Sequence, residues 1–203
     1  MHTALLSSTG AFSGSEHPAS SEDWTKSRLS LLVTDTDQLL AAGIPQYDWI
    51  DAPFGRLLVA GVGMQIVGVS LADSATASLS ELQKRFPSVG FTHSPGLYAP
   101  LAGIFHGNWP SAGYRLCVQG TPFQTAVWQA LMQIPSGRLT SYAAIAKAIA
   151  RPRAVRAVGT AIGRNPIAYF IPCHRVVPAG GGIGGYYWGK NVKERVLREE
   201  NRD

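Results

Sequence analysis

The sequence contains few of the features that mark secreted proteins, proteins stabilised by a structural metal, or membrane proteins. Its only cysteines are Cys117 and Cys173, too few for a disulfide framework or a cysteine-rich zinc site. Apolar runs such as residues 57–69 are short and interrupted by Gly or Gln, so we expect no segment that spans a bilayer. Residues 1–6 lack the basic stretch of a signal peptide. We expect a cytoplasmic protein, because a reducing compartment suits a chain with free thiols.

Acidic residues are missing from one long stretch of the chain. Residues 138–175 contain seven Lys or Arg and no Asp or Glu. Residues 1–120 carry a net charge of −3, whereas residues 121–203 carry +8. A basic patch of this kind favours a polyanionic partner, of which nucleic acid is the usual one. The alternative is a solvated basic face without a partner.

The first half of the chain predicts a flexible tail followed by a small α/β domain. Residues 1–45 form the tail, although a short strand or helix is expected near residues 29–33 and 37–40. Residues 46–119 form the domain, because short apolar runs alternate there with Gly- and Pro-containing separators. The expected strands are residues 47–51, 56–60, 65–69 and 114–118, and the expected helix is residues 74–86.

Residues 120–203 predict a mostly helical second domain. Thr121 and Pro122 suit the start of a helix that ends before Pro135. Helices at residues 142–149 and 153–164 are joined by a tight turn, which is the pattern of a helix-turn-helix. The second of them carries small and basic side chains, so its backbone can approach a nucleic-acid groove closely. The alternative is an ordinary packed helix. A last helix is expected at residues 191–201.

The residues with the clearest chemistry lie between these last two helices. Cys173 stands between Pro172 and His174 with apolar residues on both sides, which indicates an activated thiol in a mostly buried turn. The alternative is a buried structural cysteine. The glycine-rich residues 180–185 precede Tyr186, Tyr187 and Trp188. Such a loop can fold over a flat ligand, or it can be a mobile surface loop. A thiol, a DNA-binding helix and a pocket loop together suggest chemistry on a base extruded from DNA.

The chain resembles the O6-alkylguanine-DNA alkyltransferases, also called methylated-DNA–protein-cysteine methyltransferases, most closely the bacterial members. The resemblance runs from about residue 47 to residue 200. It rests on four blocks at the family's spacing: Phe123-Gln124-Thr125-Ala126-Val127-Trp128, Arg156-Ala157-Val158-Gly159, Asn165-Pro166 and Pro172-Cys173-His174-Arg175. The resemblance implies an α+β fold, with a ribonuclease H-like N-terminal domain and a winged helix-turn-helix-like C-terminal domain.

The resemblance also implies catalytic roles. Cys173 would attack the alkyl carbon on guanine O6, and His174 would take the thiol proton through a water. Glu200 would orient His174. A helical wheel supports this choice, since Glu200 shares the direction of the neighbouring apolar residues and Glu199 does not. Tyr142 would supply a proton near guanine N3, and Asn165 would tie the helix-turn-helix to the cysteine loop.

Further residues would bind DNA and the extruded base. Arg156 would fill the space that the base leaves, and the other DNA-binding positions would be Arg138, Ser141, Arg153, Ala157 and Arg164. The base pocket would comprise Val176, Tyr186, Tyr187 and Trp188. Because Trp188 is bulky where some members carry a small residue, we expect it to narrow the pocket against large O6 substituents.

The implied reaction is direct repair with a single turnover. The alkyl group of O6-alkylguanine, or of O4-methylthymine, moves irreversibly to Cys173, because a thioether has no efficient hydrolytic exit. No cofactor and no structural zinc are expected, the partner is double-stranded DNA, and the protein should act as a monomer.

Three other functions compete with this interpretation. A lesion-binding module would lack the cysteine, which is present here. A transcriptional regulator would need an additional metal-binding module, for which residues 1–45 are too short and lack cysteines. An unrelated cysteine hydrolase would need an oxyanion site and would turn over repeatedly.

Overall fold

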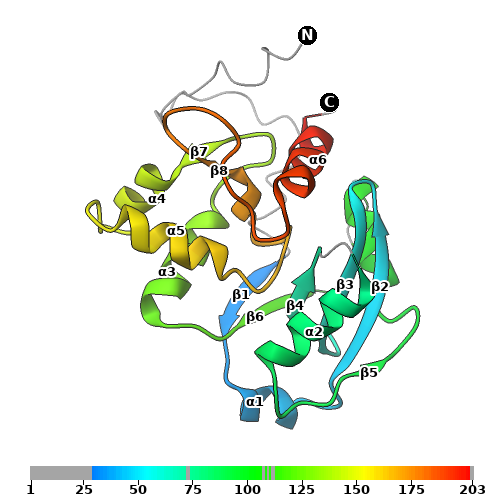
Figure 1. The fold of residues 1–203 in the computed structure, drawn as a ribbon. Coiled ribbons are helices and arrows are strands. Elements are labelled where there is room, and N and C mark those ends of the chain that lie inside the picture. The colour runs from blue at the N-terminus through cyan, green and yellow to red at the C-terminus, as the bar shows by residue number, and fades with distance from the viewer. Residues whose placement is uncertain (1–28, 72–73, 107, 109, 111–112, 202–203) are drawn as a thin grey trace.

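The computed structural model describes residues 29–71, 74–106, 108, 110 and 113–201. A six-stranded sheet with the order β1-β6-β4-β3-β2-β5 forms the first half (Figure 1). β2, β3 and β4 are antiparallel neighbours, whereas β6 runs parallel to both β4 and β1. The elements of this half are β1 (Ser30–Val33), α1 (Thr36–Ala41), β2 (Gln46–Ala52), β3 (Gly55–Val62), β4 (Gln65–Ser70), α2 (Ala75–Arg85), β5 (Thr92–His93), the 3-10 helix η1 (Ala99–His106) and β6 (Arg115–Val118).

Successive side chains of a strand point to opposite faces of the sheet, and here both sets are apolar. Leu58 and Ala60 of β3 pack in one cluster with Leu82 of α2, which lies across that face. Leu57 and Val59 belong to a second cluster, which continues into the C-terminal half of the chain. The sheet therefore serves as the support on which the C-terminal half is built.

The predicted tail is wrong for the residues that the structure describes within it. β1 pairs in parallel with β6, and Asp35 caps α1 by accepting a hydrogen bond from the Gln38 backbone at 2.7 Å. The ordered fold thus begins well before residue 46. The short strand or helix expected near residues 29–33 and 37–40 is confirmed, as a strand at the first position and a helix at the second. Residues 1–28 of the predicted tail lie outside the described residues.

Helices dominate the second half, as predicted. The helix-turn-helix is formed by α4 and α5, and α3 packs against both. α5 begins two residues later than expected, because the Ala154 amide closes a turn on the Arg151 carbonyl at 2.9 Å. The elements are α3 (Pro122–Leu131), β7 (Thr140–Ser141), α4 (Tyr142–Ala148), α5 (Val155–Gly163), the 3-10 helix η2 (Cys173–Arg175), β8 (Val176–Val177) and α6 (Lys190–Glu200).

The two halves share one continuous core instead of meeting across a thin interface. Residues of β3, α3, α5 and the segment 167–171 belong to the same buried cluster. Backbone hydrogen bonds of 3.0 Å join Val69 of β4 to Pro166 and Ala168. Arg195 of α6 also donates to the Phe54 carbonyl at 3.0 Å. The N-terminal sheet therefore fixes the segment that leads directly into Cys173.

No helix in the described part of the chain is long and apolar enough to cross a membrane.

Trp128 provides a test of how α3 holds α5, the second helix of the helix-turn-helix. Its indole is 1% exposed, and Nε1 donates to the Ala161 carbonyl of α5 at 3.0 Å. Replacing Trp128 with Phe removes this bond and leaves a small void, which should lower the free energy of unfolding by about 2 kcal/mol. Urea denaturation measures the change. Trp49→Phe, at a half-buried position, is the matched control and should cost less. Equal losses in the two variants would contradict this role for Trp128.

Candidate active site

Cys173 lies at the start of a buried turn. The backbone amides of Cys173 and Arg175 donate to the carbonyls of Ile171 and Pro172 at 2.7 and 3.1 Å, which closes the turn. The Cys173 residue is 4% exposed, and every residue from 165 to 177 is buried. The prediction of a cysteine in a mostly buried turn is confirmed.

Asn165 connects this turn to the helix-turn-helix. It follows Arg164, the C-terminal cap of α5, and is itself buried. Its Nδ2 donates to the Ile171 carbonyl at 2.8 Å and to Cys173 Sγ at 3.1 Å. Its Oδ1 accepts from the Ile167 amide at 3.0 Å. The side chain thus fixes both the backbone of the turn and the position of the sulfur.

His174 and Glu200 form the pair expected from the sequence. Glu200 projects from the end of α6, and its Oε1 lies 3.0 Å from His174 Nε2. The carboxylate can accept only if Nε2 carries the proton, which leaves Nδ1 as the basic nitrogen. Among the described residues, Nδ1 has no hydrogen-bond partner. The ring of Tyr169 stacks on the imidazole with a centroid distance of 5.8 Å.

Arg175 is a member of this site that the sequence analysis missed. Its guanidinium is buried and donates three hydrogen bonds of 2.6 to 3.2 Å to the carboxylate of Glu200, and Nη1 also donates to the Ile134 carbonyl. A buried arginine requires a buried anion. The signal that could have revealed this pair is a charged residue within the apolar segment 171–177.

Lys193 is a second missed residue. It is 1% exposed, and its Nζ donates to the carbonyls of Val176 and Gly185 at 2.7 and 3.4 Å. Burial lowers its pKa to about 8, while the nearby Cys173 acts in the opposite direction. The helical wheel that selects Glu200 also places Lys193 on the inner side of α6, so the signal was available.

The electrostatics favour a protonated thiol and a neutral imidazole at rest. Burial raises the pKa of Cys173, and hydrogen bonding from Asn165 and the charge of Lys193 offset part of that rise. Burial likewise lowers the pKa of His174, against the attraction of Glu200. Burial alone would raise the pKa of Glu200, but His174 and Arg175 together bring it down to about 2. Glu200 is therefore the fixed negative charge of the site.

A cavity of about 200 Å³ opens beside the sulfur. Its walls come from α4, α5, the cysteine turn and the glycine-rich loop: Tyr142, Gly159, Ile162, Gly163, Cys173, Gly185, Tyr186 and Tyr187. The predicted proton donor Tyr142 and the predicted pocket residues Tyr186 and Tyr187 thus line one cavity with Cys173. Burial raises the pKa of both Tyr142 and Tyr186, so their hydroxyls keep their protons at neutral pH.

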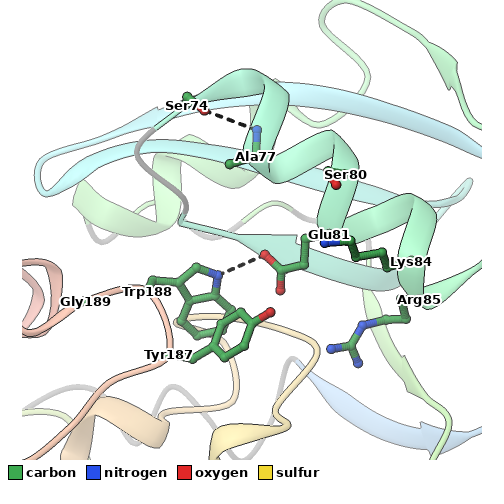
Figure 2. A pocket seen from close by; sticks show the side chains of 9 residues that line it. All are labelled: Ser74, Ala77, Ser80, Glu81, Lys84, Arg85, Tyr187, Trp188 and Gly189. Atoms are coloured by element: carbon green, nitrogen blue, oxygen red, sulfur yellow. Dashed lines mark hydrogen bonds between the residues drawn. The ribbon is translucent and has the colours of Figure 1, made fainter.

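Two residues predicted for the pocket do not line it. Val176 is fully buried, and its carbonyl is taken by Lys193. Trp188 packs edge-on against Tyr186 and Tyr187 with centroid distances of 5.3 and 5.2 Å, and its indole Nε1 donates to Glu81 of α2 at 3.2 Å (Figure 2). The expectation that Trp188 narrows the cavity is therefore corrected. The hydrogen bond to α2 turns the indole behind the tyrosines, a long-range contact that local sequence does not reveal.

The residues predicted to bind DNA lie on α5, in the turns that flank α4 and α5 and, for Arg138, in the segment before β7. Ser141 caps α4 by accepting from the Ala144 amide at 3.1 Å, so its hydroxyl oxygen is already in use. None of the predicted arginines forms an ion pair with a described residue, which leaves their charges available. The exposed residues of this set are Arg138, Arg153, Arg156, Ala157 and Arg164.

Comparisons with known proteins identify relatives of the whole described fold. Residues 122–202 match the family model of the 6-O-methylguanine DNA methyltransferase DNA binding domain. A methylated-DNA–protein-cysteine methyltransferase from Mycolicibacterium paratuberculosis is 37% identical over 162 residues, covering 77% of this chain and 93% of that protein. A crystal structure of OGT from Mycobacterium tuberculosis in complex with DNA superposes with a TM-score of 0.62 at 37% identity, covering 76% of this chain and 92% of that one.

A longer relative matches only in part. The bifunctional transcriptional activator/DNA repair enzyme Ada of Escherichia coli is 38% identical over 160 residues, which are 76% of this chain. The chain spans 45% of the length of that protein and 44% of the regulatory protein ada of Salmonella typhimurium.

The depressed pKa of Glu200 predicts how stability responds to acid. A carboxyl whose pKa is lower in the folded than in the unfolded chain stabilises the fold above its ordinary pKa of 4.5, and the contribution is lost as the pH falls toward about 2. At neutral pH, this contribution of Glu200 to the free energy of unfolding is about 3 kcal/mol. Glu200→Gln should therefore be less stable at pH 7 and should lose less stability than the wild type between about pH 5 and pH 3.

Urea denaturation at several pH values measures this difference. Glu194→Gln is the matched control, because Glu194 lies on the same helix in a surface pair with Lys190 at 3.9 Å. It should follow the wild type at every pH. If Glu200→Gln showed the same acid dependence as the wild type, the assignment of a buried, ionised Glu200 would be refuted.

Proposed function

The chain belongs to the family of methylated-DNA–protein-cysteine methyltransferases, and from this premise we propose that it repairs O6-alkylguanine in DNA by moving the alkyl group to its own Cys173. One observation carries the proposal: the sulfur of Cys173 lies in the wall of a small cavity that the recognition helix also lines. Such a cavity can receive a single base, but not a base that remains stacked in a duplex.

The recognition helix is suited to deliver the base. Arg156, Gly159 and Gly163 are spaced at i, i+3 and i+7, so they follow one stripe of α5. Arg156 is exposed, whereas the two glycines line the cavity. An arginine that enters the duplex on this stripe would hold the gap open directly beside the cavity that takes the base. Arg138, Arg153 and Arg164 would contact the phosphates.

The transfer itself is a direct displacement. The thiol proton of Cys173 passes through a water to Nδ1 of His174, while Glu200 holds the proton on Nε2. The sulfur then attacks the alkyl carbon, so that a C–S bond forms as the bond to O6 breaks. The electron pair of that bond returns to the guanine ring, and the Tyr142 hydroxyl supplies a proton at N3. Exchange with solvent then returns a proton to Tyr142, removes the one held by His174 and moves the ring proton of the base from N3 to N1. The products are guanine and an S-alkylcysteine.

The buried environment also explains why the reaction would occur only once. The thioether has no ionisable proton and no activated carbon, so water has no efficient way to remove the alkyl group. Asn165 and Lys193 stabilise the developing thiolate, since both act to lower the pKa of Cys173. We place this reaction in the cytoplasm, because a thiol that is used once must stay reduced until it reacts. A single chain would suffice for it.

Intact-mass measurement tests the acceptor. After incubation with duplex DNA that contains O6-methylguanine, the wild-type chain should gain the mass of one methylene group, stoichiometrically and without further turnover. Cys173→Ser should gain nothing, because the nucleophile is gone. Cys117→Ser is the matched control, since Cys117 is equally buried but lies in β6, and it should gain the same mass as the wild type. A hydrolase would instead release many equivalents of repaired DNA without a change in mass.

A second experiment tests base extrusion by Arg156. Arg156→Ala should slow methyl transfer from duplex DNA by about 10- to 100-fold, because the cost of unstacking is no longer offset. Transfer from the free base O6-methylguanine should be unchanged. Lys147→Ala removes the same charge from the neighbouring helix α4 and should have a much smaller effect. Equal slowing with the free base would show that Arg156 acts on the chemistry and not on extrusion.

A further inference from the structure

A second hollow lies beside the base cavity and has no role in the reaction described above. It has a volume of about 830 Å³ and lies between α2 and the end of the glycine-rich loop (Figure 2). We call it the α2 groove. Its walls are Ser74, Ala77, Ser80, Glu81, Lys84, Arg85, Tyr187, Trp188 and Gly189. It is thus formed by both halves of the chain.

Tyr187 makes the α2 groove continuous with the base cavity. This side chain lines both hollows, and it is 62% exposed, one of the most exposed large apolar side chains among the described residues. Trp188 supports its ring from behind. A nucleotide chain that enters the base cavity at one position would therefore pass Tyr187 and reach the α2 groove at the next.

The groove is cationic where it adjoins Tyr187. Lys84 and Arg85 extend from α2 into it, with the guanidinium close to the tyrosine (Figure 2). Neither forms an ion pair with a described acidic residue. The wall also holds one acid, Glu81, whose Oε2 accepts from Ser70 Oγ at 2.7 Å and from Trp188 Nε1 at 3.2 Å. Its carboxylate attracts Arg85. The two cations outnumber this acid, so the charged side chains of the wall are positive on balance.

We propose that the α2 groove binds the sugar-phosphate backbone of the DNA strand next to the extruded nucleotide. Lys84 and Arg85 contact its phosphates, and Tyr187 packs against the sugar or the unstacked base that adjoins the gap. Cations beside an exposed aromatic ring are the combination that proteins use to follow a single nucleic-acid strand. The proposal rests on the proposed function, and it extends the DNA interface from the helix-turn-helix to the N-terminal half.

Salt dependence of binding gives the sharpest test. Lys84→Gln with Arg85→Gln removes both charges and keeps side chains of similar length. Arg56→Gln with Arg115→Gln is the matched control, because it removes the same charge from exposed positions of the N-terminal half outside the groove. All proteins carry Cys173→Ser, so that a duplex with one O6-methylguanine stays unreacted while its affinity is measured.

Each lost phosphate contact should reduce the slope of log affinity against log salt by about 0.9. Between about 50 and 200 mM salt, the protein that carries only Cys173→Ser (the parent) should therefore lose about tenfold more affinity than the protein that also carries Lys84→Gln and Arg85→Gln (the groove variant). The control variant should follow the parent closely. If the groove variant had the same slope as the control, the proposal would be overturned.

A separate measurement keeps this outcome distinct from failure of the proposed function. With Cys173 intact, the groove variant should gain one methyl group from the free base O6-methylguanine at the wild-type rate, which also shows that it is folded. If the groove variant has the same salt slope as the parent and is methylated normally, only the proposal that the α2 groove binds DNA is overturned. Absence of methylation in the wild-type chain itself overturns the proposed function.

Discussion

The site depends on one buried negative charge, the carboxylate of Glu200. An ion of this kind is costly to remove from water, and it is tolerated only when donors surround it. Here Arg175 and His174 provide them, at 2.6 to 3.2 Å. The same contacts join α6 to the cysteine turn and fix which nitrogen of His174 is basic. Removing the carboxylate would leave a buried arginine without compensation and a histidine without a defined tautomer.

Small residues determine what lies on the other side of the sulfur. Gly159 and Gly163 of α5 and Gly185 of the loop leave the space that becomes the cavity, and aromatic rings close it. Gly184 shows how tight the loop is, since it has a φ of +70° and an added Cβ would lie 2.8 Å from Pro178. A base-sized hollow is therefore built by omitting side chains from the recognition helix and the loop. Asn165 joins these two elements to the nucleophile.

Much of this arrangement could be predicted from the sequence because it depends on local rules. Alternating apolar residues and Gly or Pro separators located four strands of the sheet, and Thr121 and Pro122 marked the start of a helix. The wheel of α6 selected Glu200 over Glu199. Family resemblance supplied the roles of Tyr142 and Asn165, and the structure places both beside Cys173.

The rest depends on contacts between distant segments, which local patterns do not encode. Residues 29–33 were expected to form either a strand or a helix, and pairing with the distant β6 decides between the two. The orientation of Trp188 is set by Glu81, far away in the sequence. The apolar surroundings of Arg175 and the inner position of Lys193 on α6 indicate burial, but their partners Glu200, Val176 and Gly185 become visible only in the folded chain. A polar residue can be buried only when another part of the chain supplies its hydrogen-bond partner, so its burial cannot be predicted from the residue type alone.

The central claim is that burial keeps His174 neutral while Glu200 holds its proton on Nε2, which leaves the basic Nδ1 available to the thiol of Cys173. Nitrogen-15 NMR of the His174 ring at neutral pH tests this most directly, since the shifts of the two nitrogens report where the proton is. We predict a neutral ring protonated at Nε2, and loss of this preference in Glu200→Gln. A doubly protonated ring, or a neutral ring with the proton on Nδ1, would contradict the account.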